Sequence, residues 1–453
     1  MTRLFGTDGI RGKAGAWPLV PEFLERLGRA LAHQLRVDQV DDEAAHALLG
    51  HDGRASGEDI LAGLAEGLRR GGVDVDVLGL CSTPALAHLT ATGPYRLGVM
   101  VSASHNPAED NGVKVLGHDG AKLPGPVEEA LEAELEGDAE LPDAPRRGAL
   151  RRNAALLGDY VAWLRTQAFP ELELGGMRVL VDCANGGASE LAPRVLHAFG
   201  ADVVQVHCRP DGHNINRDCG ATRPEAAAAA VVEERCEVGL TLDGDADRGL
   251  LVDGDGRILD GDALLAGLGR HMEARGALPH DTVVATVMSN LALESWLAES
   301  GVTLVRTPVG DRHVAAAMRE GGYALGGEKS GHLLFGPEHG YRGDGIYTFL
   351  KVMQVLHEER IGPRDFAAGY RDLPQELRNL RVLRKPPLDE LERLQAAIRE
   401  VEETLGDGGR VVVRFSGTED SLRLMVEAET SAAVTAAVDR LEAAAREEGI
   451  LAD

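Results

Sequence analysis

Residues 64–80 have the sequence LAEGLRRGGVDVDVLGL, which predicts a helix, a glycine stop and a strand in direct succession. Gly71 and Gly72 stand where a helix is typically closed by glycine. The segment after them alternates apolar and polar residues, as a strand does. Because a helix that leads directly into a strand is the repeating element of parallel sheets, this stretch favours an α/β fold.

The same pattern occurs twice more, in VLHAFGADVVQVH (195–207) and WLAESGVTLVRT (296–307). Each of the three has one strand candidate before it and another after it. The upstream candidates are HALLG (46–50), MRVLVD (177–182) and TVVATV (282–287). The downstream candidates are LGVMV (97–101), VGLTL (238–242) and YALG (323–326). We therefore expect three α/β domains of similar topology, each built on a parallel layer of strands within a mixed sheet.

The sequence after Pro386–Pro387 has a different pattern. It contains a helical segment (388–405), the strand candidates RVVVRF (410–415) and SLRLMVEA (421–428), a Ser-Gly-Thr turn between them, and a last helix from about Ala432. This order predicts a compact C-terminal α+β domain. The expected domains, arranged around a cleft, are 1–155, 156–257, 258–372 and 373–453.

Length and composition exclude several classes of protein. A chain of 453 residues exceeds what a single hydrophobic core supports. Its formal net charge of −26 would repel nucleic-acid phosphates, although a local basic pocket for one phosphorylated small molecule remains compatible with it. The five cysteines lack CxxC spacing, which disfavours a disulfide framework or zinc ribbon and fits a reducing cytoplasm. Without a signal-peptide core or a long apolar run, we expect no membrane association.

The third strand of each α/β unit is followed by its most polar loop. These loops are SASHNP (102–107), DGDADR (243–248) and GGEKSGH (326–332). In open parallel sheets, ligands bind beyond the carboxyl ends of the strands. Three polar loops at corresponding positions can therefore point into one cleft, which is where we expect the functional site.

The DGDADR loop carries Asp243, Asp245 and Asp247 at alternating positions, so their carboxylates can lie on one side of a short extended segment. Three carboxylates suit Mg²⁺ and leave coordination room for a phosphate oxygen. The alternative is a solvated acidic turn. A calcium EF-hand is excluded, because Arg248 stands where that loop needs glycine. A second acidic turn, VDGDGRIL (252–259), is interpreted as a hairpin connection.

In SASHNP, Ser104 is a candidate nucleophile or phosphate carrier, and an ordinary turn is the alternative. A hydrolase triad is improbable, because adjacent Ser104 and His105 are expected to point their side chains apart and no GxSxG elbow is present. A turn predicted at Asn111-Gly112 would let Lys114 approach the same loop.

Two further loops carry groups that suit a phosphorylated sugar. In GGEKSGH, Glu328 and Ser330 can bind sugar hydroxyls, and His332 can move a proton or serve only a structural role. In the tail, RFSGTEDSLR places hydroxyls, backbone amides and guanidinium groups around a turn, as a phosphate site requires. Its candidate residues are Arg414, Ser416, Gly417, Thr418 and Arg423. The alternative for this segment is a simple hairpin with surface arginines.

Taken in order, these four loops resemble one family along nearly the whole chain, the α-D-phosphohexomutases. The resemblance matches SASHNP to the phosphoserine loop, DGDADR to the magnesium loop, GEKSGH to the sugar-recognition loop and RFSGTEDSLR to the phosphate-binding loop. Four further segments resemble most closely the bacterial branch that acts on glucosamine phosphates. They are LFGTDGIRG (4–12), DCANGGAS (182–189), DGHNINRDCG (211–220) and TVMSNLALE (286–294).

The resemblance implies that Ser104 carries a phosphoryl group and, with Asp243, Asp245 and Asp247, holds one Mg²⁺. Arg11, Lys114 and His332 then match basic residues near the transferred group, whereas the substrate is bound by Arg248, Glu328, Ser330 and the tail loop. The implied reaction interconverts glucosamine 6-phosphate and glucosamine 1-phosphate through a 1,6-bisphosphate, with glucosamine or glucose 1,6-bisphosphate as activator. It would serve synthesis of UDP-N-acetylglucosamine and cell-wall precursors in the cytoplasm.

Three departures from the family pattern are visible. Lys329 stands where Gln or Met is usual, and Phe415 and Asp420 stand where Pro is common. We predict that the Lys329 side chain projects away from the sugar and is neutralised by acidic groups. The alternatives are a phosphomannomutase/phosphoglucomutase, an aspartyl-phosphate phosphatase with Asp243 as nucleophile, and a non-catalytic sugar-phosphate sensor. The sequence leaves open whether the chain forms a homodimer.

Overall fold

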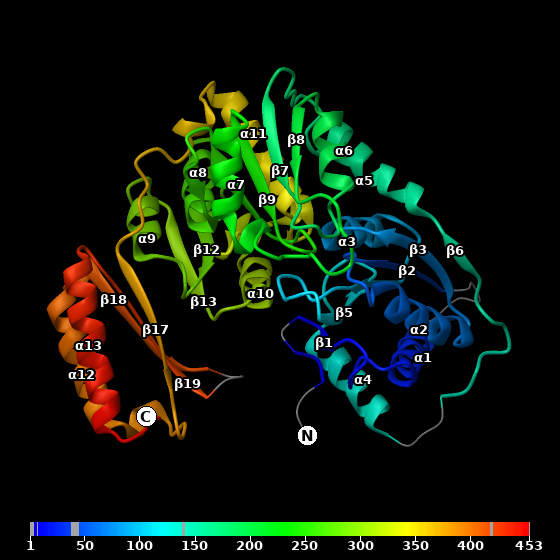
Figure 1. The fold of residues 1–453 in the computed structure, drawn as a ribbon, viewed down its shortest axis with the longest axis horizontal. Helices are drawn as coiled ribbons and strands as arrows, with labels where there is room; N and C mark the ends of the chain where they lie inside the picture. Colours follow the sequence, from blue (N-terminus) through cyan, green and yellow to red (C-terminus); the bar gives the residue numbers. More distant parts are fainter. Residues whose placement is uncertain (1–3, 7, 38–44, 138–140, 417–419, 453) are drawn as a thin grey trace. The chain divides into compact units, whose positions relative to one another are not determined.

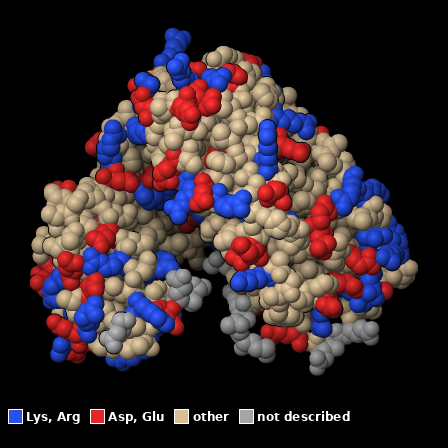
Figure 2. All heavy atoms as spheres, in the orientation of Figure 1, with Lys and Arg blue, Asp and Glu red and all other residues tan. Residues whose placement is uncertain are grey.

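The computed structural model describes residues 4–6, 8–37, 45–137, 141–416 and 420–452. The chain forms two compact units, the first of Met1–Val287 with Val305–Ala368 and the second of Met288–Leu304 with Gly369–Asp453. No helix within the described ranges is long and apolar enough to cross a membrane. Acidic and basic side chains lie interspersed on the face drawn in Figure 2, so charge does not gather into one patch there.

The first sheet of unit 1 has the strand order β1-β5-β4-β2-β3-β6. Its strands are β1 (Ile10–Lys13), β2 (His46–His51), β3 (Asp74–Leu80), β4 (Leu97–Val101), β5 (Asp110–Gly117) and β6 (Leu150–Arg152). Its helices are α1 (Pro21–Val37), α2 (Gly57–Arg70), α3 (Thr83–Thr92) and α4 (Gly125–Glu136). β5 is antiparallel to both neighbours, and the other pairs are parallel.

Helices α1 and α2 pack closely because each has a glycine, Gly28 on α1 and Gly67 on α2, that lies against the backbone of the other helix. A Cβ atom added at Gly28 would lie 2.3 Å from the carbonyl oxygen of Leu64, and one at Gly67 would lie 2.0 Å from that of Glu25. No larger residue fits at either position. The buried apolar faces of these helices and of strands β2 and β4 form the core of this domain.

The second sheet has the order β11-β10-β9-β7-β8. Its strands are β7 (Arg178–Asp182), β8 (Asp202–Val206), β9 (Val238–Leu242), β10 (Gly249–Asp253) and β11 (Ile258–Leu259). Its helices are α5 (Leu157–Trp163), α6 (Leu191–Ala198) and α7 (Pro224–Glu233). β7 is parallel to β8 and β9, whereas β10 is antiparallel to β9 and β11.

The third sheet has the order β13-β12-β14-β15-β16. Its strands are β12 (Thr282–Thr286), β13 (Thr303–Thr307), β14 (Leu325–Gly327), β15 (Leu333–Phe335) and β16 (Arg342–Gly343). Its helices are α8 (Gly261–Ala274), α10 (Asp311–Gly321) and α11 (Gly345–Glu359). β12 and β14 are parallel, and β15 is antiparallel to both of its neighbours.

Unit 2 contains an antiparallel sheet in the order β17-β19-β18. Its strands are β17 (Gln375–Arg381), β18 (Gly409–Phe415) and β19 (Ser421–Ala428), and its helices are α9 (Leu291–Ala298), α12 (Glu392–Leu405) and α13 (Ser431–Glu447). Helices α12 and α13 cover one face of this sheet (Figure 1), and their apolar side chains pack against β19 to form the core.

The structure confirms the expected α/β class, with mixed sheets and a C-terminal α+β part. The segments LGVMV and VGLTL coincide with β4 and β9, and YALG begins two residues before β14. The turn expected at Asn111-Gly112 is wrong, because both residues lie inside β5. Gly112 serves a close approach instead, since an added Cβ would lie 2.6 Å from the carbonyl oxygen of Ser102.

Candidate active site

Ser104 lies on the loop after β4, at a sharp change of chain direction. Its φ of 51° is in the left-handed region, which serine rarely adopts. The side chain is buried, and its Oγ donates a hydrogen bond to Oδ2 of Asp243 at 2.7 Å. The backbone N–H of Ser104 donates to Oγ of Ser102 at 2.8 Å. The first two predicted loops therefore meet at Ser104.

Arg54, which the sequence did not single out, holds this loop in place. Its side chain is fully buried, and Nε donates to Oδ2 of Asp52 at 2.9 Å. The remaining guanidinium nitrogens donate to four loop carbonyls, those of Ser104, Asn106, Pro107 and Asp110. A planar guanidinium that satisfies four carbonyls from one position fixes the loop backbone, and with it the strained conformation of Ser104.

The three aspartates of DGDADR converge through a turn. The backbone N–H of Ala246 donates to the carbonyl of Asp243 at 3.1 Å, and Ala246 has a φ of 60°. One carboxylate oxygen from each of Asp243, Asp245 and Asp247 lies within 4.8 Å of the others. The prediction of an extended segment is wrong, because extended chain separates alternate residues by about 6–7 Å and would keep the outer carboxylates apart.

The carboxylates of this turn fit a hard divalent cation. Burial, together with the charges of Asp247 and Asp245, raises the pKa of Asp243 to about 7. Among the described residues, Oδ1 of Asp245 is buried and has no hydrogen-bond partner. An unpartnered buried carboxylate oxygen is costly, and three converging carboxylates are a typical donor set for such a cation.

Lys114 on β5 lies beside this turn. Its Nζ is 2.7 Å from Oδ2 of Asp245, 3.0 Å from Oδ2 of Asp247 and 3.0 Å from Oδ2 of Asp8. Burial lowers the pKa of Lys114, but the three carboxylates raise it well above its usual value. The ammonium is therefore charged and adds positive potential where a phosphoryl group would meet the aspartates.

A chain of alternating charges continues from Asp8. Arg11 on β1 pairs with Asp8 and donates to the carbonyl of Ala103 at 2.9 Å. Lys122 places Nζ 2.7 Å from Oδ1 of Asp8 and 2.7 Å from Oδ2 of Asp311. Arg11 was predicted, whereas Asp8, Lys122 and Asp311 were missed. The only local signal was that the two acids stand in the short segments GTDG (6–9) and VGDR (309–312).

His332 bridges this chain to the aspartate turn. Its Nδ1 is 3.5 Å from Oδ1 of Asp247, and its Nε2 is 3.7 Å from Oδ2 of Asp311. Burial lowers the pKa of His332, but the two carboxylates raise it more, to about 9. Arg248 donates its backbone N–H to Oδ1 of Asp243 at 3.2 Å. The structure thus brings both predicted residues to the site.

His105 corrects a further expectation. Its Nδ1 lies 3.3 Å from Oγ of Ser104, so the two side chains do not point apart. The left-handed backbone at Ser104 turns its side chain back toward its neighbour. Burial, with the charges of Arg248 and Arg11, lowers the pKa of His105 to about 4. The imidazole beside the hydroxyl is therefore neutral near pH 7.

The GGEKSGH loop holds its residues in different ways. Oε1 of Glu328 accepts a hydrogen bond from the backbone N–H of Gly310 at 3.0 Å. Oγ of Ser330 is buried and has no partner among the described residues. Lys329 places Nζ 2.8 Å from Oδ2 of Asp260 and 3.3 Å from Oδ2 of Asp262. The predicted neutralisation of Lys329 by acidic groups is confirmed.

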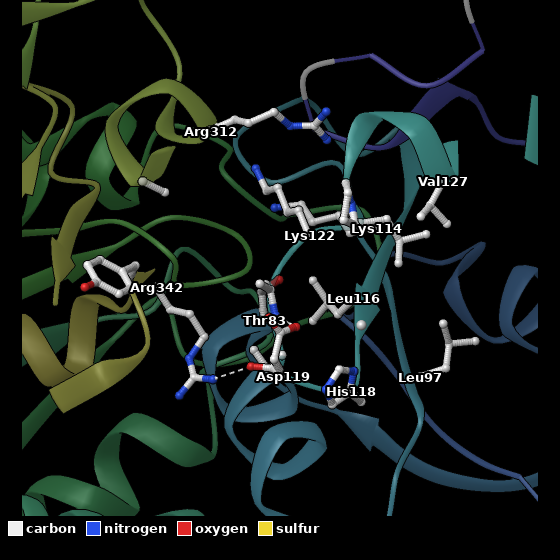
Figure 3. A pocket seen from close by; sticks show the side chains of 18 of the residues that line it. Thr83, Leu97, Lys114, Leu116, His118, Asp119, Lys122, Val127, Arg312 and Arg342 are labelled. Carbon is white, nitrogen blue, oxygen red and sulfur yellow. Dashed lines mark hydrogen bonds between the residues drawn. The ribbon is translucent and has the colours of Figure 1, made fainter. Parts of the chain in front are cut away.

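A pocket of about 680 Å³ opens beside Lys114, Asp247 and His332. Figure 3 shows basic side chains on its wall, among them Lys114, Lys122, Arg312 and Arg342. Leu97, Leu116 and Val127 provide an apolar wall. Its volume and mixed lining suit a small polar ligand with charged groups.

In unit 2, the tail loop gathers positive charge at the β18–β19 hairpin. Arg414 and Arg423 stand directly opposite each other in the antiparallel register. Nη2 of Arg423 donates to Oγ of Ser416 at 3.4 Å, and Nζ of Lys385 donates to the carbonyl of Ser416 at 3.1 Å. The predicted Gly417 and Thr418 lie outside the described residues. Like charges facing each other across a hairpin are unfavourable alone and favour an anionic ligand.

Comparison with protein families matches the chain almost from end to end. Four domain models of phosphoglucomutase/phosphomannomutase match in order. They are alpha/beta/alpha domains I (2–141), II (159–256) and III (260–375) and the C-terminal domain (377–444). The order agrees with three α/β domains followed by a different C-terminal one.

Individual relatives agree with this match. The phosphoglucosamine mutase of Anaeromyxobacter sp. (strain Fw109-5) is 43% identical, over 97% of this chain and 94% of the relative. A phosphoglucomutase/phosphomannomutase family protein from Burkholderia thailandensis has a similar fold (TM-score 0.82, 25% identity, 99% and 98% coverage). So does an Aspergillus fumigatus N-acetylphosphoglucosamine mutase in complex with GlcNAc-6P and magnesium (TM-score 0.63, 21% identity, 98% and 96% coverage). The chain therefore belongs to the phosphoglucomutase/phosphomannomutase family, the α-D-phosphohexomutases.

Proposed function

We propose that the protein is an isomerase that interconverts glucosamine 6-phosphate and glucosamine 1-phosphate, with Ser104 carrying the transferred phosphoryl group. The observation that carries this proposal is the 2.7 Å contact between Oγ of Ser104 and Asp243, at the point where three carboxylates and Lys114 converge. The choice of amino sugar is supported by relatives more than 40% identical that are phosphoglucosamine mutases.

We assign a single Mg²⁺ to Asp243, Asp245 and Asp247, with an oxygen of Ser104 or its phosphate. When bound there, Mg²⁺ would neutralise phosphoryl oxygens and so favour transfer. Lys114 would add a second positive charge from the other side of Asp245. The N-acetylphosphoglucosamine mutase from A. fumigatus, whose structure includes magnesium and a phosphosugar, supports this assignment.

The reaction would consist of two phosphoryl transfers in opposite directions. In the first, a sugar hydroxyl attacks the phosphorus on Ser104; the P–O bond to the sugar forms, the P–O bond to Oγ breaks, and the hydroxyl proton is passed on to the serine oxygen. The resulting 1,6-bisphosphate would then reorient in the site, so that its other phosphate faces Ser104. In the second, Oγ attacks the other phosphorus and the sugar hydroxyl is regenerated. The charged groups of Arg11, Lys114, His332 and Arg248 would hold the phosphoryl oxygens.

The remaining residues would position the sugar phosphate. We propose that Glu328 and Ser330 bind ring substituents, and that Arg414, Ser416, Gly417, Thr418 and Arg423 bind the phosphate that is not being transferred. A glucosamine or glucose 1,6-bisphosphate would serve as activator, and the cytoplasm is the proposed compartment. The proposed domain boundaries remain 1–155, 156–257, 258–372 and 373–453.

Mass spectrometry of the purified protein tests the phosphoserine. A phosphoryl group should be found on Ser104 and should survive hydroxylamine, which would release an aspartyl phosphate on Asp243. Ser104→Ala should abolish both the modification and the turnover, whereas Ser295→Ala, at an exposed serine of α9, should preserve them. A hydroxylamine-labile phosphate would favour the phosphatase, and active protein without phosphate on Ser104 would refute the proposal.

Competition among the 6-phosphates of glucosamine, glucose and mannose tests the sugar. Glucosamine 6-phosphate should have the highest kcat/KM. A preference for mannose or glucose 6-phosphate would instead support a phosphomannomutase/phosphoglucomutase, with the phosphoserine chemistry unchanged.

A further inference from the structure

A second group of potential metal ligands lies away from the aspartate turn, at the carboxyl end of β7 and β8. In the register of these parallel strands, Asp182 lies opposite Val206. His207, the residue after Val206, therefore lies beside Asp182. Cys219 returns to the same place at the far end of the 207–219 loop. One ligand atom from each of Asp182, His207 and Cys219 lies within 4.8 Å of the others.

The three side chains are held in a defined arrangement. Nδ1 of His207 lies 3.0 Å from Oδ2 of Asp182. Asp182 and Cys219 are fully buried, whereas the His207 side chain is 38% exposed, so the group can be reached from solvent. The backbone N–H of Gly220 donates to the same Oδ2 at 3.0 Å, which fixes the residue after Cys219 against Asp182.

The donor set is chemically unlike the aspartate turn. A thiolate, an imidazole and a carboxylate together suit Zn²⁺ and leave its fourth position open. Mg²⁺ requires oxygen ligands and avoids thiolate. We propose that Asp182, His207 and Cys219 form a second metal site in this protein, selective for Zn²⁺ or a similar soft divalent cation.

The loop that this site closes supports the phosphoserine loop. Within it, Nδ2 of Asn216 donates to the carbonyls of Ser104 and Asn106 at 2.8 and 3.2 Å. A metal ion that ties His207 and Cys219 to β7 would stiffen the segment carrying Asn216. Any effect on turnover rests on the proposed function, whereas metal binding itself does not.

Co²⁺ provides a direct spectroscopic test, since only coordination by a thiolate produces a sulfur-to-cobalt charge-transfer band. The full-length protein is freed of metal, saturated with Mg²⁺ to fill the aspartate turn, and titrated with Co²⁺. The wild type should develop the band with a single ion per chain, and Zn²⁺ should displace it. Cys219→Ser should lose the band, and His207→Gln should weaken Co²⁺ binding by at least about tenfold.

Matched controls are available in the same domain. Cys236→Ser removes a buried cysteine outside the cluster, and His197→Gln removes an exposed histidine of α6; both should retain the wild-type titration. Absence of a band in the wild type would overturn the proposal. So would a band that survives Cys219→Ser, or one that depends on Cys208 instead. If Cys219→Ser does not fold, unchanged binding by His207→Gln would overturn it equally.

Discussion

Asp245 and Asp344 are both fully buried, yet the fold treats their oxygens differently. Asp344 accepts a hydrogen bond from the backbone N–H of Tyr347 at 3.0 Å, another from the Tyr160 hydroxyl at 2.5 Å, and contacts Nε2 of His339 at 3.1 Å. Among the described residues, Asp245 accepts hydrogen bonds only on Oδ2, from Thr83 and Lys114.

The difference indicates what each carboxylate does. The described partners of Asp344 give it a structural role, because it caps α11 and joins α5 to the turn at His339. Trp163, also on α5, stacks on His88 of α3, with ring centroids 4.0 Å apart. Asp344, with both oxygens bound by groups of its own domain, stabilises the structure here, whereas Asp245 has a spare oxygen in a cationic surrounding that can meet a ligand.

The largest effect on activity is expected for Asp245→Asn, which tests whether Asp245 serves a ligand rather than the fold. Removing this charge should lower kcat by about 100- to 1000-fold, because the proposed Mg²⁺ that neutralises the transferred phosphoryl group would lose one anionic ligand. The apparent melting temperature should change little, since repulsion within the turn is relieved and Lys114 keeps its contacts with Asp8 and Asp247. Measurements of turnover and melting against Mg²⁺ concentration check both.

The matched control is Asp253→Asn, which changes the other acidic turn, where Asp253 accepts from the backbone N–H groups of Asp255 and Arg257. It should retain activity. Near wild-type activity of Asp245→Asn at limiting Mg²⁺ would refute the metal assignment.

Asp344→Ala should show the opposite behaviour. Loss of the helix cap and of the Tyr160 and His339 contacts should destabilise unit 1 by about 3 kcal/mol, with little change in KM. The urea midpoint of unfolding measures this. Asp365→Ala, at an exposed capping aspartate, should cost less than about 1 kcal/mol. Equal midpoints for the two variants would contradict the structural role of Asp344.

His88, which stacks on Trp163, allows a test of how stability depends on pH. Burial lowers the pKa of His88 from 6.5 to about 4. The unfolded chain therefore binds more protons between these values, and stability is lost as pH falls from 6.5 toward 4. His88→Phe, which preserves ring stacking on Trp163, should remove about 3 kcal/mol of this acid destabilisation. Melting curves from pH 4 to 7 decide it, and parallel curves for both proteins would exclude His88.

Arg54→Lys tests whether Arg54 acts by positioning the Ser104 loop rather than by contacting the substrate. Lysine keeps one charge beside Asp52 but cannot reach the four carbonyls of the loop, so kcat should fall about tenfold with KM unchanged. Steady-state kinetics and the level of Ser104 phosphorylation are measured together. Arg147→Lys, at an exposed ion pair, is the control. A rise in KM alone would mean that Arg54 does not position Ser104.

Lys329→Gln should have the smallest effect. Because Lys329 is paired with Asp260 and Asp262, the ratio of kcat/KM between glucosamine and glucose 6-phosphate should change less than about threefold. Competition between these substrates measures it. A reversal of preference would show that the ammonium faces the sugar.

Local patterns in the sequence were sufficient for the repeating elements. Strand β9, the aspartates after it and the serine loop after β4 lie where the apolar runs and polar loops predicted, because burial and turn chemistry act over a few residues. Antiparallel β5 was missed, since Asn111-Gly112 has the composition of a turn and only its neighbours β1 and β4 make it a strand.

Local sequence patterns were sufficient to predict the α/β class, the order of the four loops and the residue types that we propose bind phosphate and a divalent cation. The residues from distant parts of the chain that complete the candidate sites became visible only in the tertiary structure. Arg54 and Lys122 carry no local signal, and Asp182, His207 and Cys219 are scattered along the chain until two parallel strands end side by side. The physical reason is that periodicity records which face of an element is buried, whereas contacts between elements depend on how the whole chain closes.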